Sequence, residues 1–194
     1  MKQHQLHELL GSVVARHPSV RLILAGSQAL FGHLTSVPPV VEQSIEADLL
    51  LAGEAFKARQ QIEEEFGMES PYQGATGLYV HPVGLGTITV PRGWEQRLVP
   101  FGQDRGWSDV WVLEVHDLTA SKLMAGREKD YVFVIELLRN GHVGLDVLLQ
   151  RFVSFRSGVF ANAVDVRLEK LAKQLDATRL RAMADAVRQH LPTQ

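Results

Sequence analysis

Two acidic residues, Glu46 and Asp48, stand one residue apart in the apolar stretch SIEADLLL. The stretch reads as a β-strand, in which residues two apart point to the same face. The two carboxylates would then project together, with alpha carbons about 6–7 Å apart, while Ile45, Ala47 and Leu49 would face the core. Parallel carboxylates repel each other unless a cation lies between them, and Mg²⁺ combines one or two carboxylates with phosphate oxygens. The pair is therefore a candidate Mg²⁺–phosphate site, and the alternative is a solvated strand edge.

A second candidate feature is the Gly-Ser pair at Gly26 and Ser27, in the stretch LILAGSQALFGHL. Glycine lets a phosphate approach the backbone closely, and a helix that starts after it offers unpaired amides and the positive end of a dipole. The Ser27 hydroxyl could donate a hydrogen bond to the same group. The alternative is an ordinary turn with a helix cap. The stretch is not a P-loop, because it lacks the Gly-Lys-Ser/Thr ending.

The elements that must position these residues follow from hydrophobic periodicity and from turn residues. Helices are predicted over residues 3–16, 27–34, 54–66, 118–140 (with Asp117 as its cap), 144–154 and 164–190, and strands over 21–26, 44–52, 77–83, 86–90 and 109–115. This order predicts an α/β (α+β) fold, with a mixed β-sheet flanked by helices and a helical C-terminal part. We expect a domain over residues 1–140 and a helical extension over 141–194 packed on it.

The predicted helix over residues 118–140 carries a further group of charges. Lys122, Gly126 and Lys129 are spaced at i, i+4 and i+7, so they would share one face, and that face could reach a phosphate. The alternative is a solvated face on which Glu128 and Asp130 pair locally.

Composition excludes several classes of protein. The 194 residues are 45% hydrophobic and 22% charged with a net charge of −2, which is ordinary for a globular protein. Because the chain contains no cysteine, disulfides, thiolate zinc sites and cysteine nucleophiles are excluded. No apolar run has the length of a membrane span, and the polar N-terminus does not read as a signal peptide. We therefore expect a cytoplasmic protein that does not act at a membrane.

Four stretches resemble a known family. GSQALFG followed by SIEADLLL resembles the Gly-Ser…Asp-x-Asp/Glu motif of the nucleotidyltransferase fold shared with DNA polymerase beta. EVHDLTASKLMAGREKDYVFVIELL resembles the Lys-Leu…Arg-x-Lys-Asp helix of prokaryotic nucleotidyltransferase-like proteins related to the AbiEii toxins, and VPRGWEQRLV resembles a segment found in one branch of that group. The resemblance covers roughly residues 20–140.

The resemblance implies transfer of a nucleotide from an NTP to an acceptor, with Mg²⁺. The acceptor could be RNA, a protein or a small molecule, and the protein could be a toxin with an antitoxin partner. The implied roles are metal binding and catalysis for Glu46 and Asp48, triphosphate binding for Gly26 and Ser27, catalysis and nucleotide binding for Lys122, nucleotide binding for Lys129, and an accessory role for Asp130.

Two departures from the family pattern affect this interpretation. The first motif acid is commonly Asp, whereas here it is Glu46. The third carboxylate of active members is not evident, and His81 and Glu114 are the candidates for its place. A third acid completes a second metal site or accepts the proton of the attacking hydroxyl. The alternative function is therefore a catalytically degenerate protein that binds a nucleotide or a partner without turnover.

Overall fold

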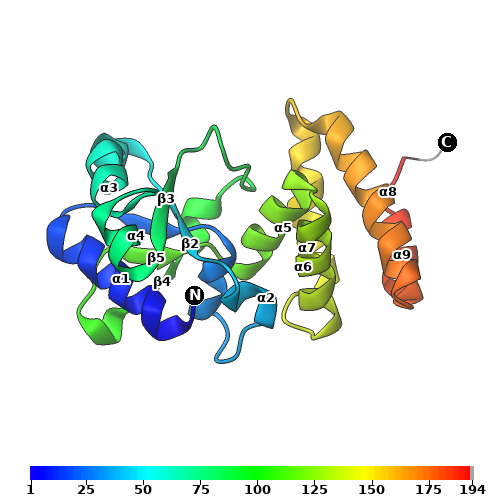
Figure 1. Cartoon of the computed structure of the whole chain (residues 1–194). Coiled ribbons are helices and arrows are strands. Elements are labelled where there is room, and N and C mark those ends of the chain that lie inside the picture. The colour runs from blue at the N-terminus through cyan, green and yellow to red at the C-terminus, as the bar shows by residue number, and fades with distance from the viewer. Residues whose placement is uncertain (193–194) are drawn as a thin grey trace. The chain divides into compact units, whose positions relative to one another are not determined.

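The computed structural model describes residues 1–192, apart from the side chain of Glu54. The chain forms two compact units. The first contains Met1–Ile88 and Glu95–Glu114, and the second contains Thr89–Trp94 and the chain from Val115 onward. Figure 1 labels α-helices and strands of both units.

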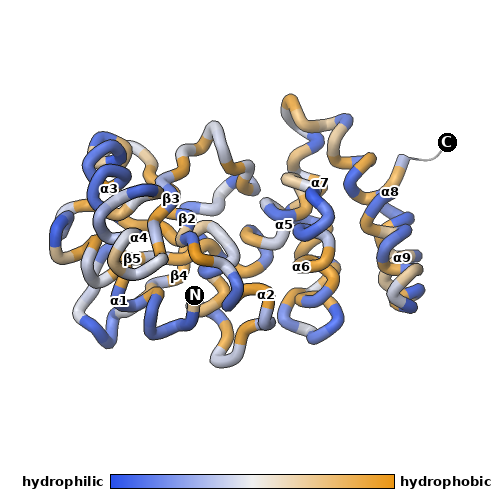
Figure 2. Tube along the Cα trace, viewed as in Figure 1, coloured by the Kyte–Doolittle hydropathy of each residue, from blue (hydrophilic) through white to orange (hydrophobic). Residues whose placement is uncertain are grey.

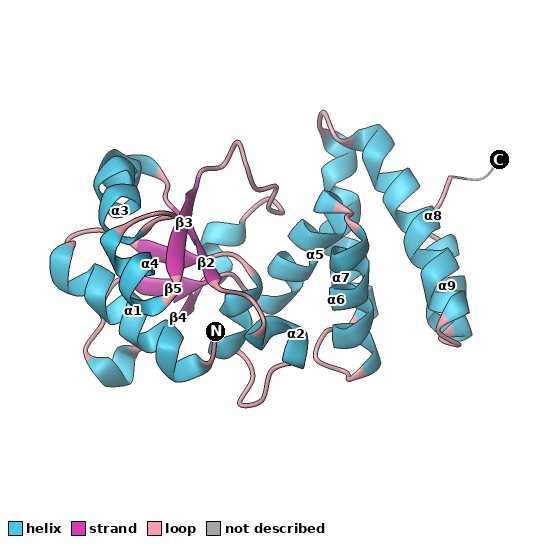
Figure 3. Ribbon diagram, viewed as in Figure 1, coloured by secondary structure: helices cyan, strands magenta, loops and turns pink. Residues whose placement is uncertain are grey.

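A five-stranded mixed sheet forms the centre of the first unit, and Figure 3 shows its strands in magenta. The strand order is β3-β2-β1-β5-β4. Strands β1 and β2 are antiparallel, β1 and β5 are parallel, β2 and β3 are parallel, and β4 and β5 are antiparallel. The strands are β1 (Leu22–Leu24), β2 (Glu46–Leu50), β3 (Tyr79–Val83), β4 (Val99–Pro100) and β5 (Val110–Val112). The predicted mixed sheet is confirmed, and β2 lies directly beside β1.

Helices surround this sheet (Figure 1). They are α1 (Gln3–Arg16), η1 (Ser27–Gly32), α2 (Pro39–Glu42), η2 (Gly53–Ala58), α3 (Arg59–Phe66), α4 (Pro71–Thr76), η3 (Trp94–Arg97) and η4 (Gln103–Arg105), where η denotes a 3₁₀ helix. Helix α1 has the predicted bounds, because Leu6, Leu9, Leu10 and Val13 recur at helical spacing and are fully buried. Figure 2 shows the same alternation of hydrophobic and hydrophilic residues along the helices.

Helix α4 was not predicted from the sequence, although its end signals are present. The Ser70 hydroxyl accepts a hydrogen bond from the backbone N–H of Gln73, Pro71 takes the first helical position, and Gly77 ends the helix in the left-handed region at φ 74°. The helix has only six residues and buries none of them, so it produces no apolar periodicity.

The strand predicted over residues 86–90 is absent, and the structure there is a turn followed by irregular chain. The backbone N–H groups of Thr87 and Ile88 both donate to the carbonyl of Gly84. These amides close a turn directly after β3, so they are not available for a strand ladder.

The second unit consists mainly of helices. They are α5 (Val115–Ala125), α6 (Glu128–Arg139), α7 (Leu145–Val153), η5 (Ser154–Ser157), α8 (Ala161–Ala177) and α9 (Arg181–Arg188). The helix predicted over residues 144–154 is confirmed as α7, whereas the one predicted over 164–190 is divided into α8 and α9. Arg179 lies between these two helices with φ 64°, a conformation that does not continue an α-helix.

The single helix predicted over residues 118–140 is wrong, because the chain breaks at Gly126 between α5 and α6. Gly126 has φ 64°, and the guanidinium of Arg167 lies where its side chain would be. Asp117 is not a cap either, since α5 begins at Val115 and Asp117 lies buried in its first turn. Lys122 and Lys129 therefore belong to different helices and do not share one helical face.

Over residues 1–192, the structure contains no helix that is both long and apolar enough to cross a membrane.

Candidate active site

The approach of strand β2 to the end of β1 defines the site. The backbone N–H of Ala25 donates to the carbonyl of Asp48 over 2.9 Å. A Cβ atom added to Gly26 would lie 2.9 Å from the Cβ of Asp48, and closer still to its Oδ2. Gly26 itself has an extended backbone, with φ −86°. Glycine is therefore required here by the proximity of the Asp48 carboxylate and not by backbone conformation.

Ser27 follows as the first residue of η1 and is half-buried. The expected helix is thus present as a 3₁₀ helix. The next side chain, Gln28, is fully buried and donates from Nε2 to the carbonyl of Val41 over 2.7 Å. This hydrogen bond fixes η1 against α2, so the turn that carries Gly26 and Ser27 is held in place from within the unit.

The carboxylates of Glu46 and Asp48 lie on one face of β2, as the spacing predicts. Both residues are partly exposed, whereas Ala47 and Leu49 are fully buried on the opposite face. Ile45 departs from this pattern, because it precedes the strand and is exposed. Alternation along β2 therefore presents the two acids to solvent from a rigid strand.

Each acid has a partner directly opposite on β3. Glu46 is in register with Tyr79, and Asp48 is in register with His81. The Tyr79 hydroxyl donates to Oε2 of Glu46 over 2.9 Å, and Nδ1 of His81 lies 3.0 Å from Oδ1 of Asp48. Two cross-strand pairs thus hold both carboxylates.

Tyr79 is the functional residue that the sequence interpretation missed. It stands two residues before His81 in GLYVHPV, so it points to the same face of the strand. Only the pairing register between β2 and β3 brings it to Glu46, and a single sequence does not provide that register.

The environment of the acids keeps the Tyr79 phenol protonated. Burial of Tyr79, together with its hydrogen bond to Glu46 and the negative charges of Glu46 and Asp48, raises its pKa to about 12. A phenol with this pKa is a hydrogen-bond donor at neutral pH. One oxygen of Glu46 is thereby occupied, and the other remains available to a ligand.

Among residues 1–192, one group of acidic and histidine side chains has the geometry to hold a metal ion. It consists of Glu46, Asp48 and His81, whose ligand atoms all lie within 4.8 Å of one another. Carboxylate oxygens and an imidazole nitrogen are ordinary ligands of divalent cations. Glu114, the other candidate for the third position, follows β5 and is not a member of this group.

The remaining candidates, Lys122, Lys129 and Asp130, belong to the second unit. The ammonium of Lys122, on α5, lies 5.8 Å from the ring centroid of Phe133. Lys129 is exposed in the first turn of α6. Asp130 is almost fully buried and accepts hydrogen bonds from the backbone and side chain of Arg127, closing a capping box. Their part in nucleotide binding stays a prediction.

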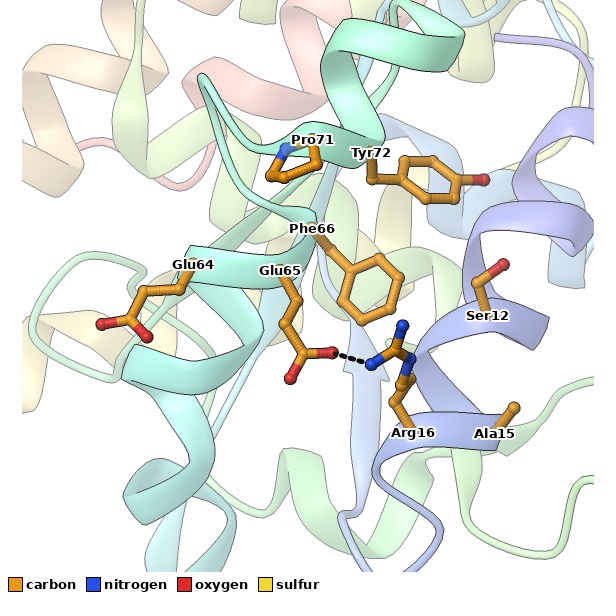
Figure 4. A pocket seen from close by; sticks show the side chains of 8 residues that line it. All are labelled: Ser12, Ala15, Arg16, Glu64, Glu65, Phe66, Pro71 and Tyr72. Atoms are coloured by element: carbon orange, nitrogen blue, oxygen red, sulfur yellow. Dashed lines mark ion pairs between the residues drawn. The ribbon is translucent and has the colours of Figure 1, made fainter.

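The first unit also has a shallow groove between α1 and the α3–α4 region. Figure 4 shows its lining, with the rings of Phe66 and Tyr72 and an ion pair between Arg16 and Glu65 that spans 3.7 Å. None of the candidate site residues lines this groove.

Comparison with known protein families gives a match over most of the chain. Residues 2–165 match the family described as nucleotidyltransferase of unknown function (DUF6036). Neither the curated proteins nor the solved structures contain a match to the chain. Since the family covers most of the sequence and includes the whole β1–β2–β3 site, the chain belongs to this nucleotidyltransferase family.

Proposed function

We propose that the protein transfers a nucleotide from a Mg²⁺-bound NTP to an acceptor hydroxyl, with Glu46 and Asp48 as the metal ligands. The observation that carries this proposal is the convergence of both carboxylates on one point beside Gly26. A triphosphate brings charge that a carboxylate pair repels, so the two require a cation between them. The absence of a side chain at Gly26 leaves room for the Asp48 carboxylate at the end of β1.

The reaction forms a bond between the acceptor oxygen and the α-phosphorus, and breaks the bond from that phosphorus to the oxygen that bridges to the β-phosphate. Pyrophosphate leaves, and the proton of the acceptor hydroxyl passes to solvent. A bound cation would neutralise charge on the phosphate oxygens and orient the leaving group. The protein's own residues position the reactants. Tyr79 holds Glu46 in place, and the Gly26–Ser27 turn binds the triphosphate.

One observation favours the alternative function, which is binding without turnover. The third residue of the group that could hold a metal ion is His81, which is not a carboxylate. A protein with two acids could hold a metal–nucleotide complex and lack the group that completes the two-metal route. An experiment that detects nucleotide transfer therefore distinguishes the two functions.

Incubation with NTPs labelled at the α-phosphate, plus Mg²⁺ and either total RNA or cell lysate, tests the proposal. Transfer of label to RNA or to a protein would identify the nucleotide and the acceptor class together. We expect transfer by the wild type and loss of transfer in Asp48→Asn. Asp104→Asn, which removes an exposed acid of η4 in the same unit, is the matched control. Nucleotide binding without transfer to any acceptor would support the alternative.

The finer parts of the family resemblance belong to the same proposal. A toxin role with an antitoxin partner and a cytoplasmic location are expected from the resemblance and from composition. Co-purification of the tagged chain from its native host tests the partner, and growth arrest upon expression, abolished by Asp48→Asn, tests the toxin role.

A further inference from the structure

The candidate metal site contains a nitrogen donor where the family pattern places an oxygen. His81 faces Asp48 across the β2–β3 ladder, and its Nδ1 lies 3.0 Å from Oδ1 of Asp48. Two adjacent ligands of an octahedral ion, each about 2.1 Å from it, are about 3.0 Å apart. The contact between the two side chains is a hydrogen bond in this structure, and its length also equals the separation of two neighbouring ligands, so a cation would replace the shared proton with little movement of either side chain.

The accessibility of these groups also suits a cation. The side chain of His81 is 48% exposed and that of Asp48 is 25% exposed, so an ion can arrive from solvent and keep several waters. The Tyr79 hydroxyl occupies Oε2 of Glu46, which leaves Oε1 as the third donor. The resulting set has two carboxylate oxygens and one imidazole nitrogen.

This donor set discriminates among metals. Mg²⁺ prefers oxygen ligands, whereas imidazole suits first-row transition metals, whose affinity for a given site rises from Mn²⁺ to Cu²⁺. Mn²⁺ accepts carboxylates, water and phosphate oxygens as Mg²⁺ does. The two carboxylates should therefore bind Mn²⁺ about as tightly as Mg²⁺, and the imidazole should add affinity for Mn²⁺ alone.

We infer that His81 is a metal ligand and that it makes this site select Mn²⁺ over Mg²⁺. The inference rests on the carboxylate site of the proposed function, and it specifies which class of divalent cation that site takes. It concerns binding of the ion alone, so it does not depend on turnover.

The test uses the chain of 194 residues with MnCl2 or MgCl2 and without nucleotide. Electron paramagnetic resonance counts the free Mn²⁺, competition with Mg²⁺ gives the ratio of the two affinities, and the pulsed form of the experiment detects a coordinated ¹⁴N nucleus. We expect the wild type to bind Mn²⁺ at least about tenfold more tightly than Mg²⁺, with a ¹⁴N coupling.

Two substitutions at position 81 separate ligation from other roles. His81→Asp should remove the ¹⁴N coupling and lower the ratio of Mn²⁺ to Mg²⁺ affinity by about tenfold while keeping Mg²⁺ binding. His81→Gln should lose the coupling and weaken Mn²⁺ binding more than Mg²⁺ binding. His4→Ala, at an exposed histidine of α1, is the control and should match the wild type. Thermal melting without metal checks that each variant is folded.

Absence of Mn²⁺ binding or of ¹⁴N coupling in the wild type, or an unchanged affinity ratio in both substitutions, would overturn the inference. The outcome is separable from that of the proposed function. If Mg²⁺-dependent nucleotide binding persists while the ¹⁴N coupling is absent, only the inference fails. If the coupling is present but no NTP binds, the metal site stands and the proposed function fails.

Discussion

Charged residues are arranged differently on the β2–β3 strands of the first unit and on the α5–α8 helices of the second. In the helices, Asp117 is fully buried and pairs with Arg151, and Glu128 at the start of α6 pairs with Lys170 of α8. On the strands, Asp48 is a quarter exposed, and its partner is the imidazole of His81. The first arrangement satisfies a carboxylate with a permanent cation, whereas the second does not.

This difference distinguishes structural charges from functional ones. A buried acid costs free energy unless a cation and hydrogen bonds compensate it, and the Asp117–Arg151 pair provides that compensation. A partly exposed acid whose partner is a phenol, as for Glu46, or an imidazole, as for Asp48, keeps free lone pairs, so it can bind an incoming cation. Removing charges from the helices should therefore reduce stability, and removing them from the strands should reduce ligand binding.

The largest expected effect is on stability. Asp117→Asn removes the buried negative charge from the pair in which the guanidinium of Arg151 lies 2.7 Å from Oδ1 of Asp117. We expect a loss of about 3 kcal/mol in the free energy of unfolding, with metal binding unchanged. Urea denaturation measures this loss, and Asp146→Asn, in the exposed first turn of α7, is the control. A loss under about 1 kcal/mol, or weaker metal binding in the folded variant, would contradict the division between the two regions.

The next effect is on the strands. In Gly26→Ala the new methyl group overlaps the side chain of Asp48, so the carboxylate must move. Overpacking of this kind costs about 2 kcal/mol, and we expect about a 30-fold loss of metal affinity. Calorimetric titration with a divalent cation measures it. Gly74→Ala is the control, because a methyl group on this exposed residue of α4 meets nothing within 4 Å. Equal affinity in the two variants would show that the carboxylate position does not matter.

Lys122 tests whether one charge of the helical region has a functional role. The family resemblance predicts that Lys122→Ala weakens NTP binding by about tenfold, the value of one charge-assisted hydrogen bond. Its cation–π contact with Phe133 is worth under about 1 kcal/mol, so the fold should persist. Lys122→Arg should restore part of the affinity, because a planar guanidinium does not reproduce a compact ammonium.

Fluorescent NTP binding measures the Lys122 effect, with Lys173→Ala, an exposed lysine of α8, as control. Unfolding of Lys122→Ala would make Lys122 a structural residue, and NTP affinity equal to that of the control would show that Lys122 does not bind the nucleotide.

The smallest effect is expected at Tyr79. In Tyr79→Phe, Glu46 loses one hydrogen bond, worth about 1 kcal/mol, so metal affinity should fall about fivefold.

The same substitution should also change how stability depends on pH. The phenol pKa is about 12 in the folded protein and 10.0 for an unperturbed tyrosine, so the unfolded chain loses this proton first. The contribution of Tyr79 to stability is complete below pH 10 and is lost as the pH rises to 12.

Absorbance at 295 nm follows the tyrosine titration directly. The chain has three tyrosines, all with a raised pKa, and Tyr79→Phe should remove a group that ionises near pH 12. A titration curve that loses only a group ionising near pH 10 would show that the phenol is not held by Glu46.

Local sequence was sufficient to predict the two parts of the site, the Glu46–Asp48 pair and the Gly26–Ser27 turn, but not their complete geometry. Strand alternation placed Glu46 and Asp48 on one face, and turn residues placed Gly26 at a strand end, because both are properties of adjacent residues. The pairing of Tyr79 with Glu46 depends on register between strands about 30 residues apart in sequence, which one chain does not reveal. The break at Gly126 was missed because apolar periodicity continues on both sides of it.

The central claim is that the two β2 carboxylates hold a cation that binds a nucleoside triphosphate. The most direct measurement is NTP affinity with and without a divalent cation, in the wild type, in Asp48→Asn and in the control Asp104→Asn. The account predicts that the cation strengthens NTP binding at least about tenfold in the wild type and the control, and has no effect in Asp48→Asn. Full cation-dependent strengthening in Asp48→Asn would place the metal–nucleotide complex elsewhere and contradict the account.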